Sequence, residues 1–257
     1  MDTPAPTTTT KRETNAYISR NQLLAPGLHL IGIKYNSGVS LNFKPGQFIE
    51  IGMDHPEKGF VRRAYSIASA PNSEEIELCI TLVEGGLLTP SVLAYEVSTP
   101  LWVSASAKGK MTLHTEGLEG RSVYLLSTGT GIAPYISMLR ANANLGTVVK
   151  TYIVHGVRSE EQLGYDAELR ELAKARPNLF YIPTVTRPSS NWTGVKGRIP
   201  SLFTTEDFAD MQDSGKSNVY LCGNPAMIDE VSDYLTARGH VIQKGKTQGT
   251  LHVEKFW

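Results

Sequence analysis

The segment from Val123 to Pro134 constrains the fold of this chain more than any other. The apolar run 123–126 predicts a buried parallel strand, the turn Gly129-Thr130-Gly131 follows it, and a helical pattern begins at Pro134. Glycines let the backbone approach a ligand closely, and the free N–H groups at the start of a helix attract an anion. The junction therefore predicts a pyrophosphate site, with a tight strand-to-helix turn that binds nothing as the alternative.

The composition excludes several classes of function. The 257 residues suffice for two domains, and 25 Lys and Arg balance 25 Asp and Glu, so no basic field indicates a nucleic-acid partner. No run of about 18 apolar residues predicts a membrane span, and the N-terminus lacks the apolar region of a secretion signal. Cys79 and Cys222 are too few for an iron–sulfur cluster with cysteine ligands or a structural zinc site. We expect a cytoplasmic protein without a metal.

The pattern changes near residue 116 and divides the chain in two. The Thr- and Pro-rich residues 1–14 are expected to be disordered. Residues 15–116 contain short alternating strands, which predict an antiparallel barrel or sandwich: 28–33, 47–51, 63–68, 76–82 and 101–104. Residues 120–257 alternate strands with helices; the strands are 123–126, 148–155, 180–185 and 219–222, and the helices lie near 134–142, 165–175, 199–203 and 226–238. This alternation predicts a parallel sheet covered on both faces, so an α/β domain follows a β domain.

The tetrapeptide Arg63-Ala64-Tyr65-Ser66 lies on a predicted strand and carries groups suited to a flat, phosphorylated ligand. Arginine pairs with phosphate, the tyrosine ring stacks on a flat ring system, and the serine hydroxyl bonds a ring edge. On a strand, Arg63 and Tyr65 share one face while Ser66 points to the other. By residue type alone, an ordinary strand with a surface arginine and a core tyrosine is the preferred interpretation.

Two further turns precede predicted helices. Gly85-Gly86-Leu87-Leu88-Thr89-Pro90 offers backbone amides where a phosphate is favoured; a hairpin turn with Thr89 as the N-cap is the compatible alternative. Leu221-Cys222-Gly223-Asn224-Pro225 is a second strand–turn–helix junction, at the sheet edge where open α/β sheets bind ligands. Cys222 lacks an evident histidine partner, so we interpret it as a buried apolar residue rather than a nucleophile.

Three arginines, Arg158, Arg187 and Arg198, each follow a predicted strand or begin a helix. Individually each is expected to be a solvated side chain. Together on one edge they suit a second phosphate beyond the pyrophosphate.

Four motifs in this order resemble those of the bacterial ferredoxin/flavodoxin–NADP reductases, over nearly the whole chain from about Tyr17. They are Arg63-Ala64-Tyr65-Ser66, Gly129-Thr130-Gly131-Ile132-Ala133-Pro134, Cys222-Gly223-Asn224-Pro225 and the terminal Trp257. The resemblance implies an antiparallel β-barrel that binds FAD, followed by a Rossmann-like parallel-sheet domain that binds NADP. It also implies a monomeric enzyme that passes a hydride from NADPH to flavin N5 and exchanges electrons with ferredoxin or flavodoxin.

The resemblance assigns roles to individual residues. Arg63 would hold the FAD pyrophosphate, Tyr65 and Ser66 would contact the isoalloxazine, and Trp257 would cover the flavin until nicotinamide displaces it. The implied FAD contacts are Arg63, Ala64, Tyr65, Ser66, Cys79, Ile80, Thr81, Leu87, Leu88, Thr89, Thr130 and Trp257. The implied NADP contacts are Thr128, Gly129, Gly131, Arg158, Arg187, Arg198, Cys222 and Gly223, with the arginines at the 2′-phosphate. The implied catalytic residues are Ser66, Cys222, Glu254 and Trp257.

The sequence leaves rival functions open. One is an NAD(P)H:flavin reductase or the reductase component of an oxygenase, and another is a flavin-binding electron-transfer subunit without turnover. If the chain binds no flavin at all, the tetrapeptide at Arg63 is an ordinary strand, so the colour of the purified protein separates the last two interpretations.

Overall fold

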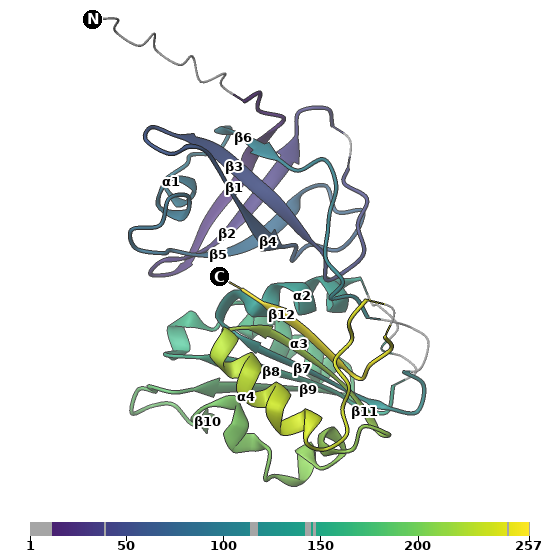
Figure 1. Ribbon diagram of the computed structural model, residues 1–257. Helices are drawn as coiled ribbons and strands as arrows, with labels where there is room; N and C mark the ends of the chain where they lie inside the picture. The colour runs from purple at the N-terminus through teal and green to yellow at the C-terminus, as the bar shows by residue number, and fades with distance from the viewer. Residues whose placement is uncertain are drawn as a thin grey trace, which may run out of the picture.

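The computed structural model describes residues 12–38, 40–113, 118–141, 145, 148–245 and 247–256. Most of the tail expected over 1–14, part of the predicted domain junction and Trp257 therefore lie outside the described residues. The expected fold class is confirmed: an antiparallel sheet is followed in the chain by a parallel sheet with helices (Figure 1). None of the described helices is both long and apolar enough to cross a bilayer.

Six antiparallel strands form the first sheet, in the order β4-β3-β6-β1-β2-β5. Isoleucines at Ile18, Ile31, Ile33, Ile49 and Ile51 are fully buried inside it, because β-branched side chains pack well on a pleated surface. The elements are β1 (Ala16–Ala25), β2 (Leu28–Tyr35), β3 (Phe48–His55), β4 (Gly59–Ser66), β5 (Ile76–Thr81), α1 (Thr89–Leu93) and β6 (Pro100–Val103).

The barrel stays open along part of one side. Its two edge strands, β4 and β5, are joined by the bridge Ile67–Leu78 and by the Ala68 N–H, which donates to the Glu77 carbonyl at 2.8 Å. Among the described residues, no ladder continues from this bridge toward 63–65 of β4 or 79–81 of β5. Backbone groups on both edges are therefore available to a ligand inserted between them.

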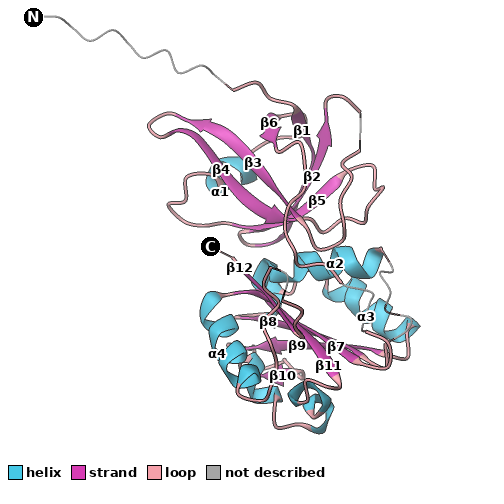
Figure 2. Cartoon of the chain, turned by 45° about the vertical axis from the view of Figure 1, so that its right-hand side comes forward, coloured by secondary structure: helices cyan, strands magenta, loops and turns pink. Residues whose placement is uncertain are grey.

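Six parallel strands form the second sheet, in the order β10-β9-β8-β7-β11-β12. Helices α2 and α3 cover the face that contributes Leu125 and Ile153 to one core, and α4 covers the face of Leu126 and Val154 (Figures 1 and 2). The strands are β7 (Ser122–Thr128), β8 (Thr151–Val157), β9 (Leu179–Val185), β10 (Val195–Lys196), β11 (Ser217–Gly223) and β12 (Leu251–Lys255). The α-helices are α2 (Ala133–Arg140), α3 (Asp166–Ala175) and α4 (Pro225–Thr236), and the 3-10 helices are η1 (Gly129–Ile132), η2 (Glu160–Gln162), η3 (Ile199–Leu202), η4 (Glu206–Phe208) and η5 (Asp210–Gln212).

The two sheets share a hydrophobic core. Leu28, Leu30 and Cys79 from the barrel belong to the same buried cluster as Leu125 of β7 and Met138 of α2. Helix α2 lies between the barrel and the parallel sheet in both views (Figures 1 and 2). The barrel and the α/β part are therefore joined by packed side chains as well as by the chain.

Several elements differ from the sequence expectations. The helix expected over 199–203 is a single 3-10 turn, η3, whose second residue is Pro200. Strand β1 was not among the expected strands, although it lies in the segment expected to form them. Strands β10 and β12 were not expected either: β10 has two residues, and the five residues of β12 pair with β11, which ends at Gly223, far earlier in the chain.

Candidate functional site

Four polar side chains form a row at the carboxyl edge of the parallel sheet. In register, Cys222 on β11 lies beside Glu254 on β12 and Ser127 on β7, and Ser127 lies beside His155 on β8. Residues paired side by side in a sheet point to the same face. That face is the one covered by α2, because Cys222 belongs to the core that α2 shares with the barrel.

Both glycine turns predicted at this edge are built around close backbone contacts. A Cβ on Gly131 would collide with the Cys222 carbonyl, and Gly223, with φ of +129°, would collide with Thr128. Thr128 Oγ1 also accepts the Asn224 N–H at 2.8 Å. Glycine is thus required at both positions, and the turns after β7 and β11 are locked together.

The first turn rests on a buried histidine that the sequence analysis missed. His155 is fully buried, and its Nε2 lies 2.9 Å from the Gly129 carbonyl oxygen. Burial lowers the pKa of His155 to about 4, so the ring is neutral at ordinary pH. Because a carbonyl only accepts, Nε2 carries the proton and donates it to this bond. His155 therefore fixes the carbonyl side of the turn, while the first N–H groups of the helix have no partner within the helix.

The three predicted arginines all lie at this edge, in two different states. Arg158 follows β8 and Arg187 follows β9, and the Arg187 N–H donates to the Arg158 carbonyl at 2.7 Å. Both side chains are exposed, and neither is ion-paired with a described carboxylate. Arg198, which precedes η3, instead pairs with Glu230 of α4 at 2.6 Å. Two exposed guanidinium groups on neighbouring segments are therefore available to an anion, whereas Arg198 must first leave Glu230.

On the barrel, the predicted tetrapeptide occupies the open edge of β4. Arg63 and Ala64 are exposed, whereas Tyr65 packs partly against the barrel core. Burial raises the pKa of Tyr65 to about 12, so the phenol is neutral. Arg63 makes one hydrogen bond, from Nη1 to the Arg62 carbonyl at 2.8 Å, and no described carboxylate pairs with it.

The barrel and the parallel sheet meet at Ser66 and Glu254. Ser66 Oγ donates to Glu254 Oε1 at 3.3 Å, across 188 positions of sequence. Burial raises the pKa of Glu254 to about 7, which the bond from Ser66 opposes only in part. Burial, with a contribution from Glu254, raises the pKa of the Cys222 thiol, which therefore stays protonated. A hydroxyl, a thiol and a carboxyl that titrates near neutral pH thus converge between the two sheets.

Several of the residues expected to contact FAD can offer it only backbone groups. The side chains of Cys79, Ile80 and Leu88 are buried in the cores. Thr89 does not cap α1: the N-cap is Leu88, and Thr89 Oγ1 accepts the Val83 N–H at 3.0 Å within the preceding turn. The other expected contacts that the structure describes, Thr81, Leu87 and Thr130, are at least partly exposed, and Trp257 lies outside the described residues.

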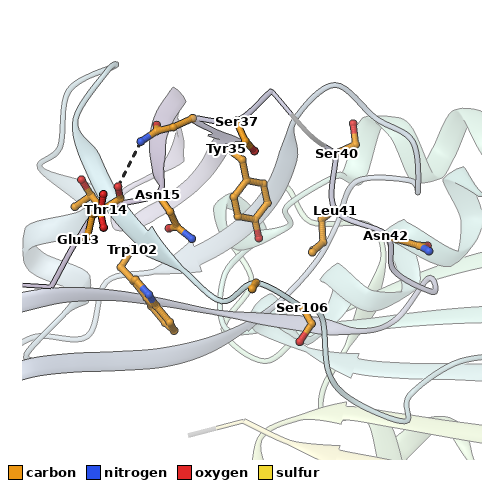
Figure 3. Close-up of a pocket in the computed structure, with 12 residues that line it drawn as sticks. Glu13, Thr14, Asn15, Tyr35, Ser37, Ser40, Leu41, Asn42, Trp102 and Ser106 are labelled. Carbon is orange, nitrogen blue, oxygen red and sulfur yellow. Dashed lines mark hydrogen bonds between the residues drawn. The ribbon is translucent and has the colours of Figure 1, made fainter.

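A wide cleft of about 810 Å³ lies on the barrel (Figure 3). Asn15, Tyr35 and Trp102 line it, and the Tyr35 hydroxyl donates to the Ser104 carbonyl at 2.7 Å. None of the predicted site residues lines this cleft, so its size does not make it the candidate site.

Comparison with known proteins agrees with this geometry. The family model of the oxidoreductase NAD-binding domain matches residues 125–233. Ferredoxin–NADP reductase B of Sorangium cellulosum is 31% identical over 240 residues, which cover 91% of this chain and 93% of that protein. Ferredoxin–NADP reductase of Azotobacter vinelandii is 31% identical over 226 residues, 82% of this chain and 84% of that protein.

A solved structure shares the whole fold. A ferredoxin NADP+ reductase of Neisseria gonorrhoeae, crystallised with bound FAD and NADP, matches with a TM-score of 0.82 at 24% identity, and the match covers 94% of this chain and 98% of that one. The structural match supports the two-domain architecture, and the sequence matches extend over most of both chains. The chain therefore belongs to the ferredoxin–NADP reductase family.

Proposed function

We propose that this protein is an FAD-dependent oxidoreductase that transfers electrons between NADPH and a one-electron carrier, ferredoxin or flavodoxin. The observation that supports the proposal most directly is the hydrogen bond between Ser66 and Glu254, next to Cys222. This contact lies between the open edge of the barrel and the glycine turn of the parallel sheet. We infer that two ligands bound at those two places would bring their reactive rings together near this contact.

The described residues fit FAD. The backbone edges at 63–65 and 79–81 are not paired with each other, and Arg63 lies on the first of them without a carboxylate partner among the described residues. We propose that Arg63 binds the FAD pyrophosphate, that Tyr65 packs on the isoalloxazine, and that Ser66 Oγ bonds the ring edge. Residues Leu87 to Thr89 would bind phosphate through their backbone amides, because the Leu88 and Thr89 side chains are buried.

The described residues also fit NADP. The glycine turn held by His155 would bind a pyrophosphate through the first N–H groups of η1. Arg158 and Arg187 would bind the 2′-phosphate, because both are exposed on segments joined by a backbone hydrogen bond and neither has a described carboxylate partner. Such contacts favour NADPH over NADH.

When bound, FAD accepts a hydride from the nicotinamide and releases electrons one at a time. The protein's share is positioning and proton handling. Ser66 Oγ can hold a hydrogen bond at the flavin edge, and Glu254, with a pKa of about 7, can hold or release a proton through that hydroxyl near neutral pH. The protonated Cys222 thiol fills the space beside Glu254 without adding a charge.

We propose that the electron carrier docks near the Ser66–Glu254 contact. A cleft of about 440 Å³ at the junction is lined by Lys44, Lys110 and Gln243, which come from both parts of the chain. Gly109, also in its lining, sits where a Cβ would lie 3.5 Å from Glu254 Oε2. Lysines in the lining of this cleft would attract an acidic carrier despite the zero net charge of the chain.

An anaerobic titration tests the proposal. The purified protein is expected to be yellow, and NADPH should bleach the flavin absorbance much faster than NADH. Arg63→Ala should lose FAD, whereas the matched control Arg62→Ala, on the opposite face of β4, should retain it. A protein that binds no added FAD would refute the proposal.

A second assay separates the rival functions. The FAD-loaded protein is mixed with NADPH and either a ferredoxin, a flavodoxin or free flavin as acceptor. Faster reduction of a carrier protein supports the proposal, faster reduction of free flavin supports a flavin reductase, and no turnover supports a passive electron-transfer subunit.

We also propose that the protein is a cytoplasmic monomer without nucleic-acid or membrane partners. Light scattering would test the oligomeric state, and cell fractionation would test the location.

A further inference from the structure

A buried carboxylate joins the barrel to the α/β part away from the Ser66–Glu254 contact. Glu77 on β5 is 6% exposed and accepts three hydrogen bonds. Arg20 of β1 donates to Oε2 at 2.5 Å, while Arg140 of α2 and the Tyr165 hydroxyl donate to Oε1 at 2.7 and 2.9 Å. Two of the three donors therefore come from the α/β part, and the bonds lower the pKa of Glu77 despite its burial.

Arg140 uses its whole guanidinium to connect the two parts. Its Nε and Nη2 donate to the two carboxylate oxygens of Glu168 on α3, each at 2.8 Å. Its Nη1 donates to Glu77 and to the Ala68 carbonyl of the barrel at 3.2 Å. This bidentate pair on one side and the two bonds on the other fix the guanidinium plane, so the end of α2 cannot shift without breaking partly buried, charge-assisted bonds.

The segment that Arg140 binds leads directly to Ser66. Ala68 and Ser69 follow Ser66 by two and three residues, and Ser137 of α2 donates from Oγ to the Ser69 carbonyl at 2.7 Å. The same helix continues directly from η1, the glycine turn of the proposed NADP site. Helix α2 therefore follows the glycine turn of the proposed NADP site at its N-terminal end, and its C-terminal half contacts the segment 68–69 that follows Ser66.

We propose that Arg140 and Glu77 are positioning residues for hydride transfer, which act by holding α2 at a fixed place against the strand that carries Ser66. The inference rests on the proposed function. The hydride, two electrons with one proton, leaves nicotinamide C4 with its bond pair and forms a bond to flavin N5, and this step needs the two atoms about 3–3.5 Å apart. A displacement of about 1 Å in such a geometry costs up to about a hundredfold in rate.

The test uses single-turnover reduction of the full chain carrying FAD, mixed anaerobically with increasing NADPH. Arg140→Gln should lower the limiting rate of flavin reduction by at least about tenfold, while the half-saturating NADPH concentration changes less than about threefold. Reoxidation of photoreduced flavin by ferricyanide, which needs no nicotinamide alignment, should keep its rate. Arg140→Lys, which retains the charge, should give an intermediate rate.

Two further variants separate a positioning role of the network from a purely structural one. Arg170→Gln on α3 is the matched control, because the ion pair of Arg170 among the described residues is with Asp166 of its own helix, and it should leave the limiting rate unchanged. Ser137→Ala removes one neutral bond and should slow reduction by a few-fold in a fully folded protein. If Arg140→Gln lowers the melting temperature but not the limiting rate, the network is only structural and the inference is wrong. If Arg140→Gln does not fold, a Ser137→Ala variant that is reduced as fast as the wild type refutes the inference in the same way. Failure of NADPH to reduce wild-type flavin would instead refute the proposed function.

Discussion

Replacing Glu254 by glutamine tests the electrostatics of the site directly. The Glu254 carboxyl has a pKa of about 7 in the folded protein, raised by burial from 4.5. The folded state therefore binds the proton more tightly than the unfolded chain. The stabilisation from that proton is complete below pH 4.5 and is lost as the pH rises through 7.

The size of the effect follows from the two pKa values. Between pH 5 and pH 8, this carboxyl should lower the free energy of unfolding of the wild type by about 2.5 kcal/mol. Glutamine has nearly the same shape and no charge, so Glu254→Gln should not show this loss. The stability of the variant relative to the wild type should therefore be higher at pH 8 than at pH 5.

Thermal unfolding followed by circular dichroism measures this difference. At about 2–4 °C per kcal/mol for a chain of this size, the melting temperature of Glu254→Gln relative to wild type should rise by about 5–10 °C from pH 5 to pH 8. Glu161→Gln, which removes an exposed carboxyl on η2, is the control and should show no such change. The same relative melting temperature for Glu254→Gln at both pH values would refute the raised pKa of this carboxyl.

Three other substitutions test separate parts of the site. His155→Leu removes the donor to the Gly129 carbonyl and should raise the KM for NADPH about fivefold, whereas His155→Gln should restore most of the affinity in the same steady-state assay. Arg158→Ala and Arg187→Ala should each raise the KM for NADPH by about tenfold or more and leave the KM for NADH nearly unchanged; equal effects would mean that they do not bind the 2′-phosphate. Gly223→Ala should destabilise the protein by more than about 2 kcal/mol in urea unfolding, because a Cβ at φ of +129° collides with the neighbouring turn; an unchanged midpoint would contradict that packing.

The local part of the site could be predicted from the sequence. The glycine turns at Gly129 and Gly223 depend on backbone conformations and close approaches that few other residues tolerate, so the residues themselves indicate the turns. The β and α/β halves were likewise predictable, because hydrophobic alternation and the strand–helix order are periodic along the chain.

Contacts between distant segments were decided only by the tertiary structure. Glu254 could be assigned to the site by resemblance, but its bond to Ser66 exists only because β12 adds to the edge of β11 and meets the barrel. His155 and Arg140 are ordinary residues in the sequence, and their roles follow from what buries them. The reason is physical: adjacent residues determine backbone conformation, whereas burial, hydrogen-bond partners and pKa depend on side chains that only the packing of the two sheets brings together.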